Sequence, residues 1–137
     1  MKSSVEATSE KLKETLFGPI AYAKVVLLEE GSAVAGMALY FTNYSTWRAK
    51  PGVYLEDLYI REQYRRKGYG LQLLAYLAAE VKRINGARLE WSVLLWNKPS
   101  IDFYESLGAE NLGKEWQTMR VADSALDKLA SALKMAP

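Results

Sequence analysis

Residues 63–87, QYRRKGYGLQLLAYLAAEVKRINGA, join a basic loop to an amphipathic helix. Three consecutive cations at 65–67 precede two glycines, and apolar side chains then recur at helical spacing. These apolar residues are Leu74, Leu77, Ala78, Val81 and Ile84, and Asn85-Gly86 supplies a signal for the end of the helix. A helix N-terminus exposes free N–H groups and the positive end of the helix dipole, so this junction is suited to hold an anion.

The two glycines of this junction, Gly68 and Gly70, let the backbone turn tightly and approach a ligand closely. The side chains of Arg65, Arg66 and Lys67 could then bind further phosphate oxygens. A G-x-G pattern alone also fits a solvated loop with a glycine turn, so the residues leave both interpretations open. Neither G-x-x-x-x-G-K-[ST] nor G-x-G-x-x-G occurs in the chain. Their absence disfavours a nucleotide hydrolase and favours a pyrophosphate ligand other than ATP or NAD.

The sequence around this junction predicts a single domain over residues 1–137 of the α/β (α+β) class. On the N-terminal side we expect a helix at 9–17, hairpin strands at 22–30 and 33–45, a loop at 46–52 and a strand at 53–60. On the C-terminal side we expect a central strand at 87–96, a helix at 97–109, a last strand at 115–121 and an amphipathic helix at 124–135. This order predicts a mixed, mostly antiparallel central sheet flanked by helices.

The net charge of the chain and its lack of cysteine and histidine limit which ligands and catalytic groups it can use. The 137 residues carry a net charge of only +2, so no global field attracts nucleic acid or a membrane. There is no cysteine and no histidine, which excludes thiolate nucleophiles, His-based triads and the usual zinc sites. Proton transfer in an enzyme of this composition falls to carboxylate, tyrosine, lysine or water. The first residues lack the apolar region of a signal peptide, so we expect a cytoplasmic protein.

Two acids, Glu56 and Asp57, stand in the middle of the strand expected at 53–60. Neighbours on a regular strand point to opposite faces, so at least one acid is expected to face an apolar layer. An edge strand or a satisfied hydrogen-bond network would explain them structurally. Beside a cleft, a carboxylate would instead attract a cationic amine and accept its proton.

Aromatic residues surround the helix expected at 97–109. On sequence alone we expect Tyr104, Phe103, Trp91 and Trp96 to pack, with Trp96 also a candidate wall of a ligand cleft. Asn97 is placed to cap this helix through its side chain.

Two longer motifs make a resemblance specific. Residues 54–74, YLEDLYIREQYRRKGYGLQLL, resemble the R/Q-x-x-G-x-G/A motif of the GNAT acetyltransferase superfamily. Residues 89–109, LEWSVLLWNKPSIDFYESLGA, resemble the W-N-x-P-[SA]-I-x-F-Y-x-x-x-G-A pattern of its diamine branch, which includes spermidine/spermine and thialysine acetyltransferases. The similarity runs from about residue 12 to residue 121, and two motifs in the same order and spacing make chance agreement remote.

The resemblance implies roles for particular residues. In the family, loop amides grip the pyrophosphate of coenzyme A, so acetyl-CoA is the expected cosubstrate and no metal is expected. The acids that match Glu56 and Asp57 bind the amine, Glu56 serves as the base, and the tyrosine that matches Tyr104 protonates the departing thiolate. A backbone N–H of residues 58–60 polarises the carbonyl. The residues expected near the cofactor are Leu58, Tyr59, Ile60, Arg65, Arg66, Lys67, Gly68, Tyr69, Gly70, Asn97 and Ser100.

We therefore predict an acetyl-CoA-dependent N-acetyltransferase acting on a primary amine of a small molecule. Direct attack in a ternary complex is expected, because no cysteine is present to carry the acetyl group. One alternative is a non-catalytic acetyl-CoA sensor or subunit. Another is an RNA-binding module that uses Tyr64 and Tyr69 with the cations at 65–67; the near-neutral charge and the lack of a second basic cluster argue against it.

One feature departs from the family pattern. Members normally open with a strand and a helix before the helix expected at 9–17, and we expect neither element in the 137 residues of this sequence. One sheet edge is then expected to be open, and open edges pair readily with another chain. Because the diamine branch also tends to dimerise, we predict a homodimer.

Overall fold

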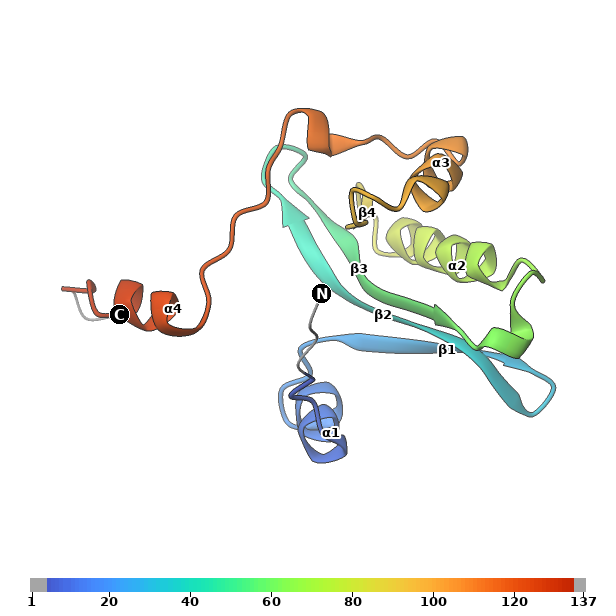
Figure 1. The fold of residues 1–137 in the computed structure, drawn as a ribbon, viewed down its shortest axis with the longest axis horizontal. Coiled ribbons are helices and arrows are strands. Elements are labelled where there is room, and N and C mark those ends of the chain that lie inside the picture. Colours follow the sequence, from blue (N-terminus) through green and yellow to red (C-terminus); the bar gives the residue numbers. More distant parts are fainter. Residues whose placement is uncertain (1–4, 135–137) are drawn as a thin grey trace. The chain divides into compact units, whose positions relative to one another are not determined.

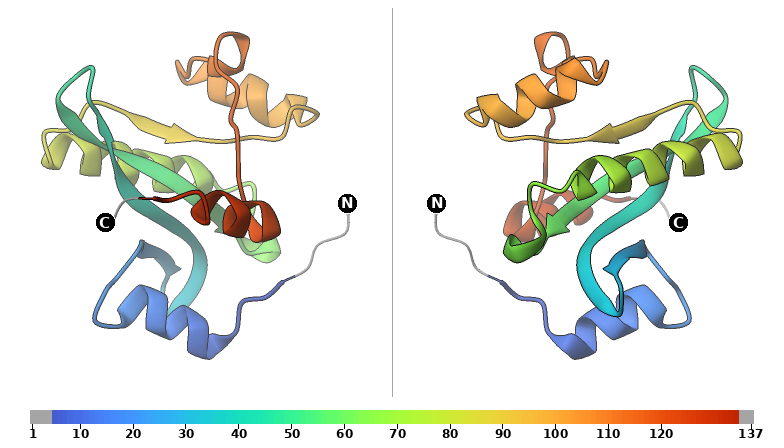
Figure 2. Two further views of the ribbon diagram at one scale, coloured as in Figure 1. Left: turned by 90° about the vertical axis from the view of Figure 1, so that its left-hand side faces the viewer. Right: turned by 90° about the vertical axis from the view of Figure 1, so that its right-hand side faces the viewer.

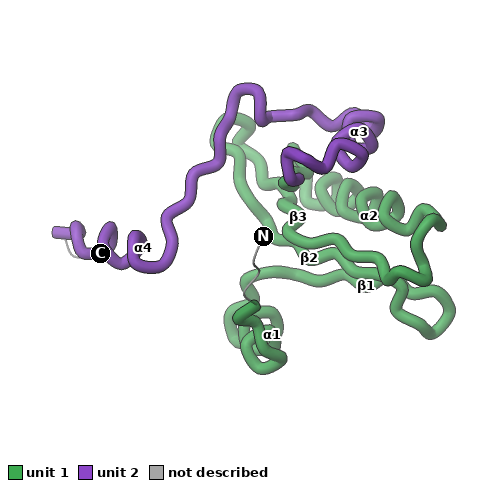
Figure 3. The backbone as a smooth tube through the Cα atoms, viewed as in Figure 1, with its two compact units in different colours: residues 1–92 green, residues 93–137 purple. Residues whose placement is uncertain are grey.

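The computed structural model describes residues 5–134 and divides the chain into two compact units, residues 1–92 and residues 93–137 (Figure 3). Each unit is described by itself. The first contains a four-stranded sheet with the strand order β1-β2-β3-β4 (Figure 1). The strands are β1 (Lys24–Glu30), β2 (Ala33–Ser45), β3 (Lys50–Ile60) and β4 (Leu89–Trp91). β1, β2 and β3 pair antiparallel and β3 pairs parallel with β4, which confirms the mixed sheet.

The core of the first unit lies between this sheet and helix α2 (Tyr69–Arg83), which packs on β3 (Figure 2). The helix buries Leu73, Leu74, Leu77 and Val81, and the sheet contributes Ala35, Ala38, Tyr40, Val53 and Leu55. The helix prediction is confirmed, but its apolar face is turned slightly: Leu73 is buried, while Ala78 is exposed. Asn85 has a φ of 55°, as a left-handed residue after a helix end requires.

The predicted N-terminal helix and hairpin are confirmed, although β1 begins at Lys24 rather than at residue 22. Helix α1 (Ser9–Phe17) begins at Thr8, whose side chain accepts a hydrogen bond from the Lys11 N–H at 3.1 Å. β1 and β2 form the expected hairpin, with Gly31 at a φ of +63° in its turn. β3 begins at Lys50, which pairs with Ser45, so the loop is shorter than expected.

The predicted central strand at 87–96 is wrong in length and position. Only Leu89–Trp91 form β4, and it pairs with β3 alone among residues 5–134. The strand predicted at 115–121 does not form, and no strand among residues 5–134 pairs with the other edge of β4. The apolar run that suggested a buried strand is exposed at Leu95 and Trp96, by 91% and 76%.

The described part of the second unit, residues 93–134, forms two α-helices and a short 3-10 turn. α3 (Lys98–Ser106) begins at Asn97, as predicted, and has Pro99 in its first turn; the 3-10 turn η2 spans Leu112–Lys114. α4 covers Asp123–Ala130, which is shorter than the helix expected at 124–135; position 135 lies outside the described residues. No residue of 93–134 is buried, and the apolar residues Leu126, Leu129 and Leu133 of the region predicted as the last helix are exposed.

Candidate active site

The loop between the short 3-10 helix η1 (Glu62–Tyr64) and α2 forms a turn with open space around its glycines. Arg66 and Gly68 both have positive φ, 65° and 79°. A Cβ atom at Gly68 would meet nothing within 4 Å, and at Gly70 the nearest atom is Leu58 Cδ2 at 4.0 Å. The Gln72 N–H donates to Gly68 O at 3.1 Å, so N–H groups earlier in the first turn precede the helical ladder and are available to a ligand.

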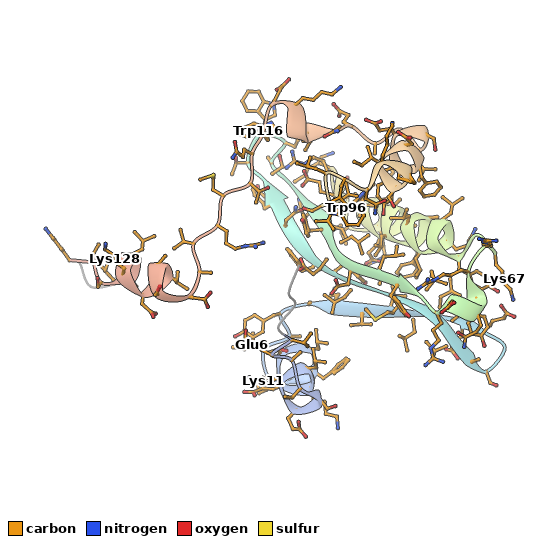
Figure 4. All side chains as sticks on the ribbon, viewed as in Figure 1. Glu6, Lys11, Lys67, Trp96, Trp116 and Lys128 are labelled. Atoms are coloured by element: carbon orange, nitrogen blue, oxygen red, sulfur yellow. The ribbon has the colours of Figure 1, made fainter. Side chains whose placement is uncertain are left out.

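The three cations of this loop are not equivalent. Arg65 Nε donates to Ile60 O at 2.9 Å, and the Arg65 guanidinium lies 5.5 Å from the centre of the Tyr59 ring. Lys67 Nζ pairs with the Glu30 carboxylate at 3.1 Å, on the right of Figure 4. The Arg66 side chain, in contrast, has no hydrogen bond, ion pair or ring contact with another residue of 5–134. Arg66 is therefore the cation of the loop most free to meet an anion.

Glu30, at the end of β1, accepts a second hydrogen bond, from the Tyr69 hydroxyl. This hydrogen bond, followed by the contact with Lys67, lowers the pKa of the Glu30 carboxyl below its ordinary value. The same carboxylate raises the pKa of the Tyr69 phenol and of the Lys67 ammonium, because each donates a hydrogen bond to it. The three pKa shifts therefore favour a charged Glu30 carboxylate, a charged Lys67 ammonium and a neutral Tyr69 hydroxyl, the forms that make these hydrogen bonds.

Glu56 is the extra residue of a β-bulge in β3. Leu55 pairs with Tyr40 and Asp57 pairs with Leu39, which leaves Glu56 without a partner on β2. Both Glu56 and Asp57 are exposed. The prediction that one acid faces an apolar layer is therefore wrong, because the bulge interrupts the alternation on which it rested.

β3 parts from β4 directly before this bulge. The parallel ladder ends at the pair Leu55–Trp91, while β3 continues to Ile60. Arg61 N–H donates to Ala35 O of β2 at 2.8 Å, and hydrogen-bonding residues alternate along an antiparallel strand. The N–H groups of Leu58 and Ile60 consequently face the other edge, which β4 has left open. Of the predicted residues 58–60, Leu58 and Ile60 therefore direct their N–H groups toward the edge of β3 that β4 does not cover.

The remaining candidates lie in the second unit. Tyr104 is half-buried on α3, with its ring centre 5.8 Å from that of Phe103. Asn97 Oδ1 accepts the Ser100 N–H at 3.4 Å, so both predicted residues take part in the helix cap. Phe103 is 43% exposed and Trp96 76% exposed, so the packing predicted for Trp96 is wrong. The structure thus collects the predicted residues into two groups, one in each unit.

Sequence reasoning missed polar contacts of the first unit that join distant residues, and two of them lie near the candidate site residues. Glu30 is 37 residues from Lys67, and only the β1–β2 hairpin brings it to the loop. The Tyr54 and Ser92 hydroxyls lie 2.6 Å apart, directly after the end of β4. Neither pair carries a local sequence signal.

Comparisons with known proteins agree with this geometry. Residues 4–109 match the model of the acetyltransferase (GNAT) family. The chain belongs to the GNAT acetyltransferase family. It is 41% identical to a thialysine N-epsilon-acetyltransferase of Caenorhabditis elegans over 95% of this chain and 81% of that protein. An L-ornithine N5-acetyltransferase of Arabidopsis thaliana is 44% identical over 70% of this chain, but the match spans only 42% of that protein.

A solved structure supports the fold. An integron cassette protein from the mobile metagenome of V. cholerae superimposes with a TM-score of 0.78 and 30% identity, over 90% of this chain and 78% of that one. The N-acetyltransferase prediction and the resemblance to the diamine branch are confirmed. Among residues 5–134, no helix has the length and apolar character needed to cross a membrane.

Proposed function

We propose that this GNAT family member transfers an acetyl group from acetyl-CoA to a primary amine of a small molecule such as a diamine, a polyamine or a thialysine-like amino acid. The observation that carries the proposal is the opening of β3 away from β4 just before the glycine loop. Among residues 5–134, the N–H groups of Leu58 and Ile60 then have no strand partner, and those in the first turn of α2 have no helical partner. Both sets lie between residues 58 and 71. The activities named for the relatives from C. elegans and A. thaliana support an amine acceptor.

The loop fits the pyrophosphate of coenzyme A. Gly68 and Gly70 leave room for close approach of a ligand, Arg66 is available to an anion, and the first turn of α2 offers N–H groups. Bound acetyl-CoA would supply the acetyl group as a thioester. We assign its contacts to Leu58, Tyr59, Ile60, residues 65–70, Asn97 and Ser100, and no metal takes part. The Leu58 N–H is the proposed donor to the carbonyl oxygen.

The acceptor amine would meet the acids of the bulge. An alkylammonium has a pKa of about 10.4, so losing its proton at pH 7 costs roughly 4 to 5 kcal/mol. Glu56, exposed and turned out of the regular strand, would take this proton directly or through water. Asp57 would add a second negative charge that attracts the cation.

Tyr104 would complete the reaction by giving its hydroxyl proton to the departing sulfur. Glu56 would thus act as the general base toward the amine, and Tyr104 as the general acid toward the sulfur. No residue needs to form a covalent bond with the acetyl group. The test is a thiol-release assay with acetyl-CoA across a panel of amines, with calorimetric binding of acetyl-CoA alongside it. Binding without thiol release on any amine would indicate the non-catalytic alternative.

We also propose that the chain forms a homodimer, in the cytoplasm. The support is the second unit, in which Trp116, Met119, Leu126, Leu129 and Leu133 are all between 51% and 83% exposed. The outer edge of β1 has no strand beside it among residues 5–134, and an apolar groove lies between β1 and α2, lined by Val26, Leu28, Leu73 and Tyr76 among others. Light scattering tests this: a fully active species of single-chain mass would end the dimer proposal.

A further inference from the structure

The two residues that flank Gly68 in the loop both bind one carboxylate from a distant strand. Lys67 Nζ lies 3.1 and 3.2 Å from the two Glu30 carboxylate oxygens, and the Tyr69 hydroxyl donates to Glu30 Oε2. We propose that Glu30 is a positioning residue, which holds the candidate pyrophosphate loop in its binding conformation without contacting the substrates. This inference rests on the proposed use of acetyl-CoA.

The geometry explains why the loop needs such an anchor. Gly68 has a φ of +79° and no atom near the position of a Cβ, so neither side-chain packing nor backbone preference fixes its conformation. Glu30, in contrast, is the last residue of β1, paired with Ala33 across the hairpin. Fixing the residues on both sides of Gly68 to a strand therefore restricts the most permissive point of the loop.

The carboxylate also has an opposing effect on an anionic ligand. It neutralises Lys67, and its own negative charge repels phosphate. If charge alone mattered, removing Glu30 would strengthen binding. We infer that positioning outweighs repulsion, because the pyrophosphate depends on several backbone N–H groups held in one arrangement, whereas the Lys67–Glu30 pair is 45% and 40% exposed and well screened.

Four variants separate these effects. Glu30→Ala removes both bonds, while Glu30→Gln removes the charge and keeps an oxygen that can accept from Tyr69. Tyr69→Phe removes one donor and keeps the ring. Glu29→Ala is the matched control, because Glu29 is the neighbouring acid, is exposed and makes none of these contacts.

The measurements are calorimetric Kd for acetyl-CoA, KM for acetyl-CoA and for the amine, and thermal unfolding to verify the fold. For Glu30→Ala we expect a Kd raised roughly fivefold to tenfold, the loss of about one charge-assisted hydrogen bond. KM for acetyl-CoA should rise with it, while kcat and KM for the amine stay near wild type. The Kd of Glu30→Gln for acetyl-CoA should lie between those of wild type and Glu30→Ala. The Kd of Glu29→Ala should match that of wild type.

A double-mutant cycle adds a readout that general destabilisation would not give. If Tyr69 acts through Glu30, the losses from Glu30→Ala and Tyr69→Phe should be less than additive in acetyl-CoA Kd. Unchanged or tighter binding in a folded Glu30→Ala variant would overturn the positioning role while leaving the proposed function intact. If the wild-type chain binds no acetyl-CoA, the proposed function fails first and the inference falls with it.

Discussion

The two units of this chain differ in the burial of their apolar side chains. In the first unit, α2 and the sheet bury a continuous set of side chains, with Leu77 and Ala38 fully inaccessible. In the second unit no described residue is buried, although large apolar side chains such as Trp116, Met119 and Leu129 occur along α4 and the segment that precedes it. The difference indicates that the loop and bulge of the first unit are supported by their own chain. Tyr104 lies in the second unit, where it is half-buried with its ring centre 5.8 Å from that of Phe103.

The largest expected effect lies in the first unit, at the glycine loop. Gly70→Asp and Gly68→Asp should both abolish acetyl-CoA binding, because they place bulk and negative charge where the pyrophosphate would lie. Gly70→Asp is the cleaner variant, since Gly68 has a positive φ that strains any side chain. Ala79→Asp, exposed on α2, is the control for added charge. Calorimetry decides, and normal affinity in a folded Gly70→Asp protein would refute the cofactor assignment.

The next prediction compares one leucine from each unit. Leu77→Ala should lower the free energy of unfolding by about 2 to 5 kcal/mol, because Leu77 is fully buried. Leu129→Ala should cost less than about 0.5 kcal/mol in dilute solution, because Leu129 is 60% exposed. Urea unfolding at several protein concentrations measures both. A Leu129→Ala penalty that grows with concentration would show that a second copy covers this residue, and a large penalty at every concentration would break the contrast between the units.

Tyr104→Phe tests the second unit in catalysis. The ring is kept and the proton is lost, so turnover should fall by about 10²-fold with acetyl-CoA affinity largely retained. Phe103→Leu is a suitable control, since Phe103 neighbours Tyr104 and is given no role in proton transfer. Wild-type turnover in Tyr104→Phe would return this tyrosine to a packing role.

Glu56→Gln tests the bulge of the first unit, with a smaller and pH-dependent effect. Turnover should fall at neutral pH, where the acceptor amine is protonated, and the defect should shrink as pH rises toward the amine pKa of about 10.4. Rate profiles from pH 7 to 10 for wild type and variant measure this. A defect of constant size across that range would contradict the base role.

The smallest expected effect concerns the stability of the loop anchor. The folded-state pKa of Glu30 is lowered by Tyr69 and Lys67. The stability that this carboxylate adds is therefore present above the unfolded-state pKa of about 4.3 and is lost as pH falls through the folded-state value. The difference in unfolding free energy between wild type and Glu30→Gln should be constant near neutral pH and decline in acid. A difference that grows as pH falls would contradict the assignment.

The sequence predicts the elements that follow from local pattern. The helical spacing of Leu74, Leu77 and Val81, the glycines of the loop and the Asn97 cap all lie where expected. The errors come from interactions that no local pattern records. The bulge at Glu56 is set by register against β2, and Glu30 reaches the loop through a hairpin. Residues 115–121 have a pattern typical of a strand but pair with no strand among residues 5–134, and such pairing is not encoded in the local pattern.

The central claim is acetyl transfer to an amine by direct attack, and product analysis tests it most directly. The wild-type chain would be incubated with acetyl-CoA and thialysine, ornithine or a polyamine, and initial rates would be measured while both substrates are varied. We expect a product heavier by one acetyl group on an amine nitrogen, with intersecting double-reciprocal lines as for a ternary complex. Acetyl-CoA binding without any acetylated amine, or parallel lines that indicate an acetylated enzyme, would contradict it.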